Sequence, residues 1–181
     1  FDFTLAQMPD QFTTFRHKIE KGAYTIRQPV SCALSKSFVL HDSNMQKFAV
    51  IPDANLVDNL SNLIGDERSS FPYWTAEFRG GSQAALQHLS HYFSTDLAHH
   101  YKQTRNQLQG TRFSTKFSPW LASGALSAPQ IVAALRQFED EHGKNDSSYW
   151  IWFELLWRDY FRFLHVKYAV QLYRANGLSK T

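Results

Sequence analysis

The sequence predicts an all-α fold for residues 79–181, preceded by a long, mostly irregular connector over residues 1–78. No proline or glycine occurs in residues 145–176, which predicts one long helix. After Gly80 and Gly81, apolar residues recur three or four positions apart, the spacing of helices with one buried face. In residues 24–78 this periodicity weakens and three prolines interrupt the chain, as is typical of a connector.

The connector is expected to contain two short helices. The first follows Pro9, carries Phe12, Phe15 and Ile19 on one face, and ends near Gly22. The second covers residues 55–64, where apolar side chains stand at Leu56, Leu60, Leu63 and Ile64. Isolated extended pieces are expected around Val39, Leu40, Phe48, Val50 and Ile51.

Three further helices follow the glycine pair. The first begins near Ser82, and its predicted buried face holds Leu86, Leu89 and Phe93. Ser127 and Gln130 form a capping box that opens the next, which passes through Ile131, Leu135 and Phe138 and stops at Gly143. The polar cluster at residues 145–148 caps the long aromatic helix, which is expected to run from about Ser147 to Tyr173.

The composition narrows the class of protein. Fifteen Phe, eight Tyr and five Trp among 181 residues indicate a core of large side chains or a site built for stacking. A net charge of +3 permits a polyanionic partner without demanding one. The single Cys32 excludes an internal disulfide, and no apolar run reaches the roughly 18 residues of a membrane span. We therefore expect a soluble, cytoplasmic protein with no membrane partner. Because the chain begins with Phe1, we also expect a piece of a longer polypeptide.

Charged residues inside the aromatic helix are the first candidate site. Residues 150–164 place apolar side chains on every side, which predicts burial all round, yet Glu154, Arg158, Asp159 and Arg162 lie among them. A buried charge costs several kcal/mol unless it is paired or meets a polar ligand. Glu154 and Arg158 stand one turn apart, at the spacing of an ion pair, with Trp157 on nearly the same face. Two interpretations remain: a core helix with an internal ion pair, or an aromatic-lined pocket for a planar ligand.

A second candidate lies at Ser114-Thr-Lys-Phe-Ser-Pro119. Ser118 fits a helix N-cap and Pro119 the first helical position. Just before them stand the hydroxyls of Ser114 and Thr115 and the ammonium group of Lys116, which beside a helix N-terminus could bind a phosphate. The alternative interpretation is an ordinary helix cap without a ligand. The basic run at residues 101–106 is either a solvated helix end or a source of a phenol and a cation for anions, through Tyr101 and Arg105.

Metal binding and hydrolytic chemistry are not indicated. The histidines at positions 88, 91, 99 and 100 have no cysteine or carboxylate cluster at ligand spacing, so we expect them to be solvated, on exposed helix positions, and expect no metal site. No Ser-His-Asp arrangement, P-loop or dinucleotide-binding fingerprint is present.

Three segments, in this order and spacing, resemble the cryptochrome/photolyase family, most of all its DASH branch. They are Tyr101-Lys-Gln-Thr-Arg-Asn106, then Ser114-Thr-Lys-Phe-Ser-Pro-Trp-Leu-Ala122 with Gly124, then Glu154-Leu-Leu-Trp-Arg-Asp-Tyr-Phe-Arg-Phe163. Residues 12–20 and 80–93 also resemble flanking parts of that branch, whereas residues 24–75 match poorly. The resemblance implies that residues 79–181 are the N-terminal, helical half of an FAD-binding domain.

The resemblance also implies roles for individual residues. FAD, in a folded shape, is implied to contact Tyr101, Ser114, Thr115, Lys116, Phe117, Ser118 and Arg158. Glu154 and Trp157 are implied to be the catalytic residues, facing a flipped pyrimidine dimer by hydrogen bonding and stacking, and Arg105 to contact the DNA backbone. The implied activity is a blue-light photolyase that splits cyclobutane pyrimidine dimers, preferentially in single-stranded DNA, by electron transfer from reduced FAD.

The chain departs from the family pattern in two motifs. Gly80-Gly-Ser-Gln83 stands where Gly-Gly-Glu-Thr is usual, and Ser127-Ala-Pro-Gln130 replaces a run containing Ser-Pro-Arg, which removes a basic residue. The family's N-terminal domain, which holds an antenna chromophore, and the later half of its FAD domain are also expected to be missing. We therefore expect this chain alone to be inactive and colourless, with FAD weakly bound or absent.

The long helix is also expected to expose aromatic side chains to solvent. Without the later half of the domain, the few remaining helices are not expected to bury all of Phe153, Trp157, Tyr160, Phe161 and Leu164, which favours a symmetric dimer through the aromatic helix. Two other functions remain open for the parent protein: a signalling cryptochrome without repair activity, or a nucleic-acid-binding module with incidental flavin.

Overall fold

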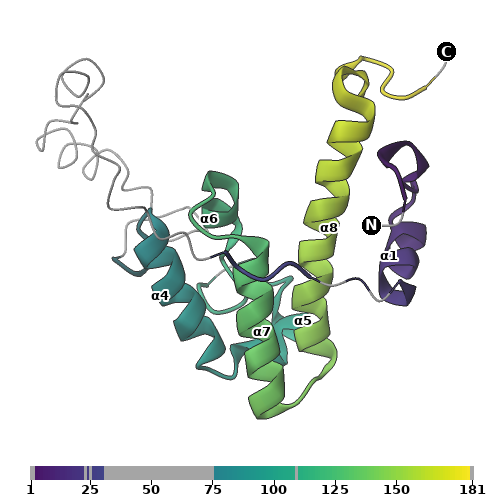
Figure 1. Ribbon diagram of the computed structural model, residues 1–181. Coiled ribbons are helices and arrows are strands. Elements are labelled where there is room, and N and C mark those ends of the chain that lie inside the picture. The colour runs from purple at the N-terminus through teal and green to yellow at the C-terminus, as the bar shows by residue number, and fades with distance from the viewer. Residues whose placement is uncertain (1–2, 23, 25, 31–75, 109, 180–181) are drawn as a thin grey trace, which may run out of the picture.

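A computed structural model describes residues 3–22, 24, 26–30, 76–108 and 110–179 (Figure 1). Within these ranges every regular element is a helix and no strand occurs, so the predicted all-α fold is confirmed there. The helix expected at residues 55–64, the extended pieces between residues 39 and 51, and Cys32 lie outside the described residues. In the described part, no helix is both long and apolar enough to cross a membrane.

The main body is a bundle of α4 (Ser82–Phe93), α5 (Leu97–Thr104), α6 (Ser118–Ser123), α7 (Ala128–His142) and the first half of α8 (Asp146–Tyr168) (Figure 1). Here α5 lies along α8, while α4 packs against α7 and against the short 3-10 helix η2 (Ala76–Phe78). These contacts surround one large apolar core, whose most buried aromatic and aliphatic members include Phe78, Tyr92, Phe117, Trp120, Leu126, Ile131, Leu135 and Ile151.

The second half of α8 extends beyond this bundle, and the N-terminal segment packs on it (Figure 1). This segment contains η1 (Leu5–Gln7) and α1 (Phe12–Lys21), which confirms the predicted helix ending near Gly22. A second apolar cluster joins it to α8 through Met8, Phe12, Phe15, Phe153, Leu156 and Tyr160. At the far end, Lys167 Nζ lies 2.6 Å from Asp10 Oδ1, and this hydrogen bond holds the pKa of Asp10 below its usual value.

The capping signals predicted for α7 and α8 are confirmed. At the start of α7, the Ser127 amide donates to Gln130 Oε1 over 2.9 Å, and Gly143, at φ +85°, follows the last residue of that helix. At the start of α8, Asn145 Oδ1 accepts a 2.9 Å bond from the Ser148 amide. Local polar chemistry therefore sets both helix starts.

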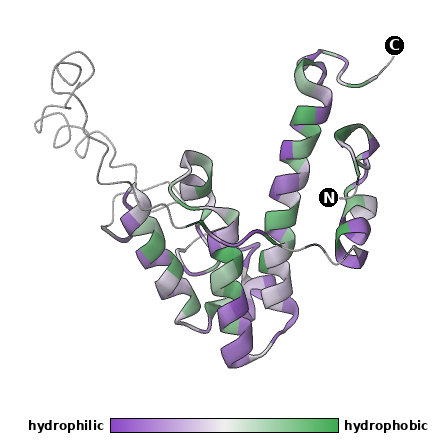
Figure 2. Ribbon diagram, viewed as in Figure 1, coloured by the Kyte–Doolittle hydropathy of each residue, from purple (hydrophilic) through white to green (hydrophobic). Residues whose placement is uncertain are grey.

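The long helix differs from expectation in its end and its burial. α8 stops at Tyr168, where Ala169 adopts φ +45°, and η3 (Ala169–Tyr173) continues as a 3-10 turn. Figure 2 shows hydrophilic residues among hydrophobic ones along α8. The prediction of burial all round was wrong, because α1 covers only part of the projecting half and leaves Phe161 52% exposed. Phe153 and Tyr160, by contrast, are buried.

Candidate functional site

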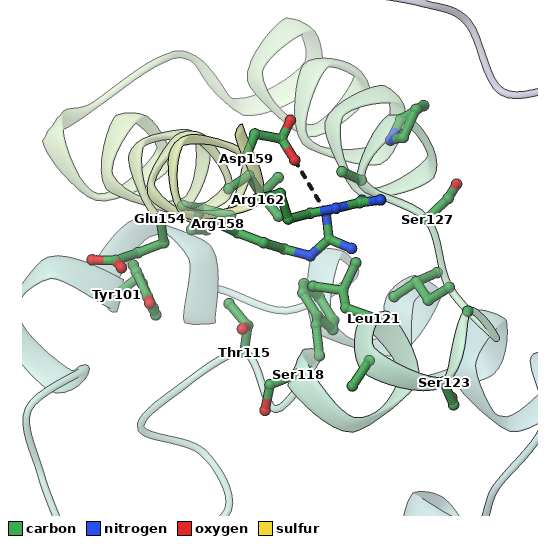
Figure 3. A pocket seen from close by; sticks show the side chains of 18 residues that line it. Tyr101, Thr115, Ser118, Leu121, Ser123, Ser127, Glu154, Arg158, Asp159 and Arg162 are labelled. Atoms are coloured by element: carbon green, nitrogen blue, oxygen red, sulfur yellow. Dashed lines mark hydrogen bonds and ion pairs between the residues drawn. The ribbon is translucent and has the colours of Figure 1, made fainter. Parts of the chain in front are cut away.

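A cavity of about 960 Å³ opens between α8, the end of α5, α6 and the turn into α7 (Figure 3). Its apolar lining includes Phe117, Leu121, Ile151 and Leu155. Its polar lining comes from hydroxyl and charged side chains that Figure 3 shows gathered around the opening: Tyr101, Thr115, Ser118, Ser123, Ser127, Glu154, Arg158, Asp159 and Arg162. A mixed apolar and polar cavity of this size is typical of a ligand site.

The cavity gathers most of the side chains that the sequence singled out. Five of the seven predicted cofactor residues line it, together with Glu154: Tyr101, Thr115, Phe117, Ser118 and Arg158. Ser114 and Lys116 belong to the same loop and are half-buried, but they do not line the cavity. Lys116 has φ +56°, and burial lowers the pKa of its ammonium group. Arg105 and Trp157 also lie outside the lining.

A buried histidine holds the loop that carries Thr115. His88 is 5% exposed, with its ring 4.9 Å from that of Phe78 and 5.1 Å from that of Trp120, measured between centroids. Its Nε2 lies 2.9 Å from the Thr115 carbonyl oxygen. The expectation of solvated histidines was therefore wrong for His88, because its hydrogen-bond partner is a loop 27 residues away in sequence.

Two neighbouring expectations also need correction. On α4, Leu86 is 44% exposed, and Tyr92 and His88 share the buried face with Leu89 and Phe93. On α6, Ser118 is the first helical residue and Phe117 precedes it as the cap, one position earlier than predicted. The Ser118 side chain consequently lines the cavity.

The ion pairs along α8 differ from the predicted one. Glu154 pairs with Arg105, which follows the last residue of α5, whereas Arg158 Nη1 lies 3.1 Å from Asp159 Oδ1. The internal ion pair between Glu154 and Arg158, one of the two interpretations of the sequence, is not formed, because α5 lies along α8 and brings Arg105 to the carboxylate. Figure 3 shows the pairing of Arg158 within the cavity.

Burial and charge shift two titratable groups of the lining. Burial raises the pKa of the Tyr101 phenol, Glu154 raises it further, and Arg105 opposes that rise. Burial also raises the pKa of the Asp159 carboxyl, although Arg158 and Arg162 oppose it. The lining of the cavity therefore combines a phenol, two carboxyl groups and two guanidinium groups.

Trp157 faces α1 instead of the cavity. Its indole stacks on Phe12 with centroids 3.5 Å apart and an angle of 12° between the planes, and it lies 5.3 Å from the ring of Phe161. Trp157 was expected on nearly the same face as Glu154 and Arg158, but its indole packs on α1 and does not line the cavity with them. The preference of the indole for this side follows from the aromatic rings of α1 and α8 that surround it.

Two charged cavity residues had no assigned role. Asp159 and Arg162 line the cavity beside Arg158, and the signal was present in the sequence: Glu154, Arg158 and Arg162 recur every fourth residue, which places them along one face of a helix. In the described part of the chain, no group of three or more His, Cys, Asp or Glu side chains is arranged to hold a metal ion.

The sequence and the structure are both similar to those of proteins named cryptochrome. No family model matches the sequence. A protein of Idiomarina loihiensis named cryptochrome DASH is 44% identical over 177 residues, which are 98% of this chain and 35% of that protein. The cryptochrome DASH of Synechocystis sp. is 38% identical over 97% of this chain and 34% of its own length. The crystal structure of a Synechocystis cryptochrome superposes with a TM-score of 0.72 and 34% identity, covering 98% of this chain and 35% of that one. The chain thus spans about a third of the length of these relatives.

Proposed function

Because this chain belongs to the DASH branch of the cryptochrome/photolyase family, we propose that it is part of an FAD-dependent photolyase. The proposed reaction is the splitting of cyclobutane pyrimidine dimers under blue light, in single-stranded DNA. An antenna chromophore is proposed to bind elsewhere in the parent protein. The chain by itself is proposed to be inactive, with FAD weakly bound or absent, since it spans about a third of its relatives' length.

The observation that carries this proposal is the shared cavity. Five residues proposed to hold FAD come from three separate places in the sequence, yet all line one space. These places are α5, the loop before α6 together with the first residue of α6, and the middle of α8. Such convergence of distant residues supports a common ligand more strongly than any one motif does.

The chemistry of the lining fits FAD. Arg158 and Arg162 supply guanidinium groups, and Tyr101, Thr115 and Ser118 supply hydroxyls that donate to phosphate oxygens. The apolar side chains suit a planar ring system. When bound, reduced FAD supplies the light-driven electron that opens the dimer. The residues of this chain would bind and orient FAD and exclude water from the cavity.

Glu154 and Arg105 are proposed to contact DNA. Glu154 lines the cavity and is 35% exposed, so its carboxylate is open to a base flipped out of the strand. There it would stabilise charge that develops on the dimer. Trp157 is proposed to stack on the same dimer, which requires its indole to leave Phe12.

A light-dependent repair assay with the complete parent protein tests the proposal. Bound flavin should appear in the blue and near-ultraviolet absorbance, and dimer-containing single strands should be repaired in light but not in darkness. Glu154→Ala is expected to slow repair by about 100-fold, the scale of losing one charge-stabilising group. The control, Glu141→Ala, alters an exposed carboxylate on α7 outside the cavity and should leave repair unchanged. Undiminished repair by Glu154→Ala would overturn the assigned role.

A signalling cryptochrome without repair activity is the second candidate. The stacking of Trp157 on Phe12 and the pairing of Glu154 with Arg105 favour it, since both proposed dimer contacts are engaged within the protein. Bound flavin without any light-dependent repair would support signalling and refute the photolyase. A nucleic-acid-binding module would instead bind DNA without requiring flavin.

Self-association of the chain is a separate proposal. Phe161, Val166, Val170 and Tyr173 are all more than half exposed along α8 and η3. We propose that a second copy packs in a two-fold dimer on the side of α8 that carries Phe161. Sedimentation equilibrium should show a dimer that Phe161→Glu disrupts, and a monomer at all concentrations would contradict it.

A further inference from the structure

The ion pair between Arg105 and Glu154 lies at the edge of the cavity. Glu154 lines the cavity and Arg105 does not, and their side chains are 35% and 27% exposed. The Arg105 guanidinium also lies over the indole of Trp150, with its central carbon 4.6 Å from the ring centroid. Arg105 is therefore held by a carboxylate and an aromatic face, and part of it remains open to solvent.

The ion pair between Arg105 and Glu154 competes with the DNA contact that is proposed for each of the two residues. A carboxylate that accepts hydrogen bonds from a guanidinium has fewer lone pairs left for a base. A guanidinium bound to a carboxylate has fewer N–H groups left for a phosphate. Both groups cannot serve DNA fully while they bind each other.

Phosphate is a direct substitute for the carboxylate. Both anions accept two parallel N–H bonds from the fork of a guanidinium, so the exchange keeps the arginine geometry. An ion pair that is partly exposed to solvent contributes little to stability, so it is easily broken. Once Arg105 turns to a phosphate, the Glu154 carboxylate regains its acceptors beside the cavity.

We propose that Arg105 is a positioning residue that exchanges Glu154 for a backbone phosphate when a single-stranded nucleic acid reaches the cavity, freeing Glu154 to face the base. This inference rests on the proposed DNA partner and deepens it. The Arg105 guanidinium thereby links DNA binding to the availability of the Glu154 carboxylate as a hydrogen-bond acceptor for the base.

A double-mutant cycle in DNA binding tests the exchange. The probe is a fluorescent oligothymidylate without dimers, bound by the complete polypeptide that carries this chain. Glu154→Gln removes the competing carboxylate and should lower Kd about two- to fivefold. Arg105→Gln should raise Kd by a similar factor and reduce the salt dependence by about one phosphate contact. In the Arg105→Gln background, Glu154→Gln should leave Kd unchanged, because no guanidinium remains to be released.

The neighbouring pair of Lys102 and Asp146 provides the matched control. It joins the same two helices, with Lys102 Nζ 2.9 Å from Asp146 Oδ2, and Asp146 does not line the cavity. Asp146→Asn removes the same negative charge, so any general gain in DNA affinity should appear equally with and without Arg105. A gain from Asp146→Asn that disappears with Arg105→Gln would overturn the specific exchange.

The outcomes separate the exchange from the proposed function. If Glu154→Gln tightens binding equally in both backgrounds, the carboxylate acts by simple repulsion and the exchange is refuted while the DNA partner stands. If the unaltered protein does not bind the oligonucleotide, the proposed DNA partner fails, and the exchange fails with it.

Discussion

Removal of the Phe12 ring should loosen α1 from α8. Phe12 is 8% exposed, and its ring stacks on Trp157 at 3.5 Å and meets Phe153 and Tyr160 edge-on at 5.2 and 5.4 Å. Truncation of a buried Phe to Ala typically costs about 3–5 kcal/mol. Because this cluster lies beside the projecting half of α8, its neighbours can relax, and we expect the lower end, about 3 kcal/mol. For a chain of this length that corresponds to a fall in Tm of about 6–12 °C.

Urea unfolding followed by circular dichroism measures the effect on the free energy of unfolding. Tryptophan fluorescence measures the local effect, since the indole of Trp157 becomes more exposed when Phe12 is lost. Phe12→Leu keeps much of the apolar volume and should cost about 1 kcal/mol. Thr13→Ala, at an exposed position of the same helix, should change stability by less than about 0.5 kcal/mol. A loss of less than about 1 kcal/mol for Phe12→Ala would refute the conclusion that this stack joins α1 to α8.

Two further substitutions test the surroundings of the cavity. Burial raises the pKa of Asp159 in the folded state. The Asp159 carboxyl therefore contributes to stability below about pH 4, and this contribution is lost as the pH rises through the raised pKa of the folded state. Asp159→Asn should therefore raise Tm relative to the unaltered chain at neutral pH and not at pH 3, and thermal melts showing a pH-independent difference would contradict this. His88→Leu keeps most of the side-chain volume but leaves the Thr115 carbonyl without its donor, so urea titration should show a loss of about 1–3 kcal/mol. The exposed His91→Leu is the control, and an equal effect in both variants would show that the bond to Thr115 contributes nothing.

The helix boundaries could be predicted because their causes are local in sequence. The Gln130 side chain accepts a hydrogen bond from the amide of Ser127, three residues earlier. The Asn145 side chain likewise accepts one from the amide of Ser148, three residues later. These bonds form within one turn of helix, so residue type and spacing are enough to identify them. The early end of α8 at Tyr168 had no comparable signal, since no Gly or Pro stands there.

The faces of the helices could be predicted less well, because distant residues decide them. Glu154 meets Arg105, 49 positions earlier, and His88 meets Thr115, 27 positions later. Helical periodicity shows which residues share a face, but not which other helix that face will meet. A ligand pocket at the charged residues of α8 was one of two interpretations that the sequence left open. The family resemblance added FAD as the shared ligand of the three segments, and it assigned no role to Asp159 and Arg162.

The structure resolves the conflict between charge and apolar surface in α8 by giving different faces different neighbours. Phe153 and Tyr160 are buried with α1, whereas Glu154 and Arg158 line the cavity and remain partly exposed. The charges therefore avoid the cost of full burial because they border a cavity, and their pairs to Arg105 and Asp159 are partly solvated. It follows that Phe12→Ala and Arg105→Gln perturb separate sides of one helix. Their effects on stability should add, and strong coupling between them would mean that α8 transmits strain from one face to the other.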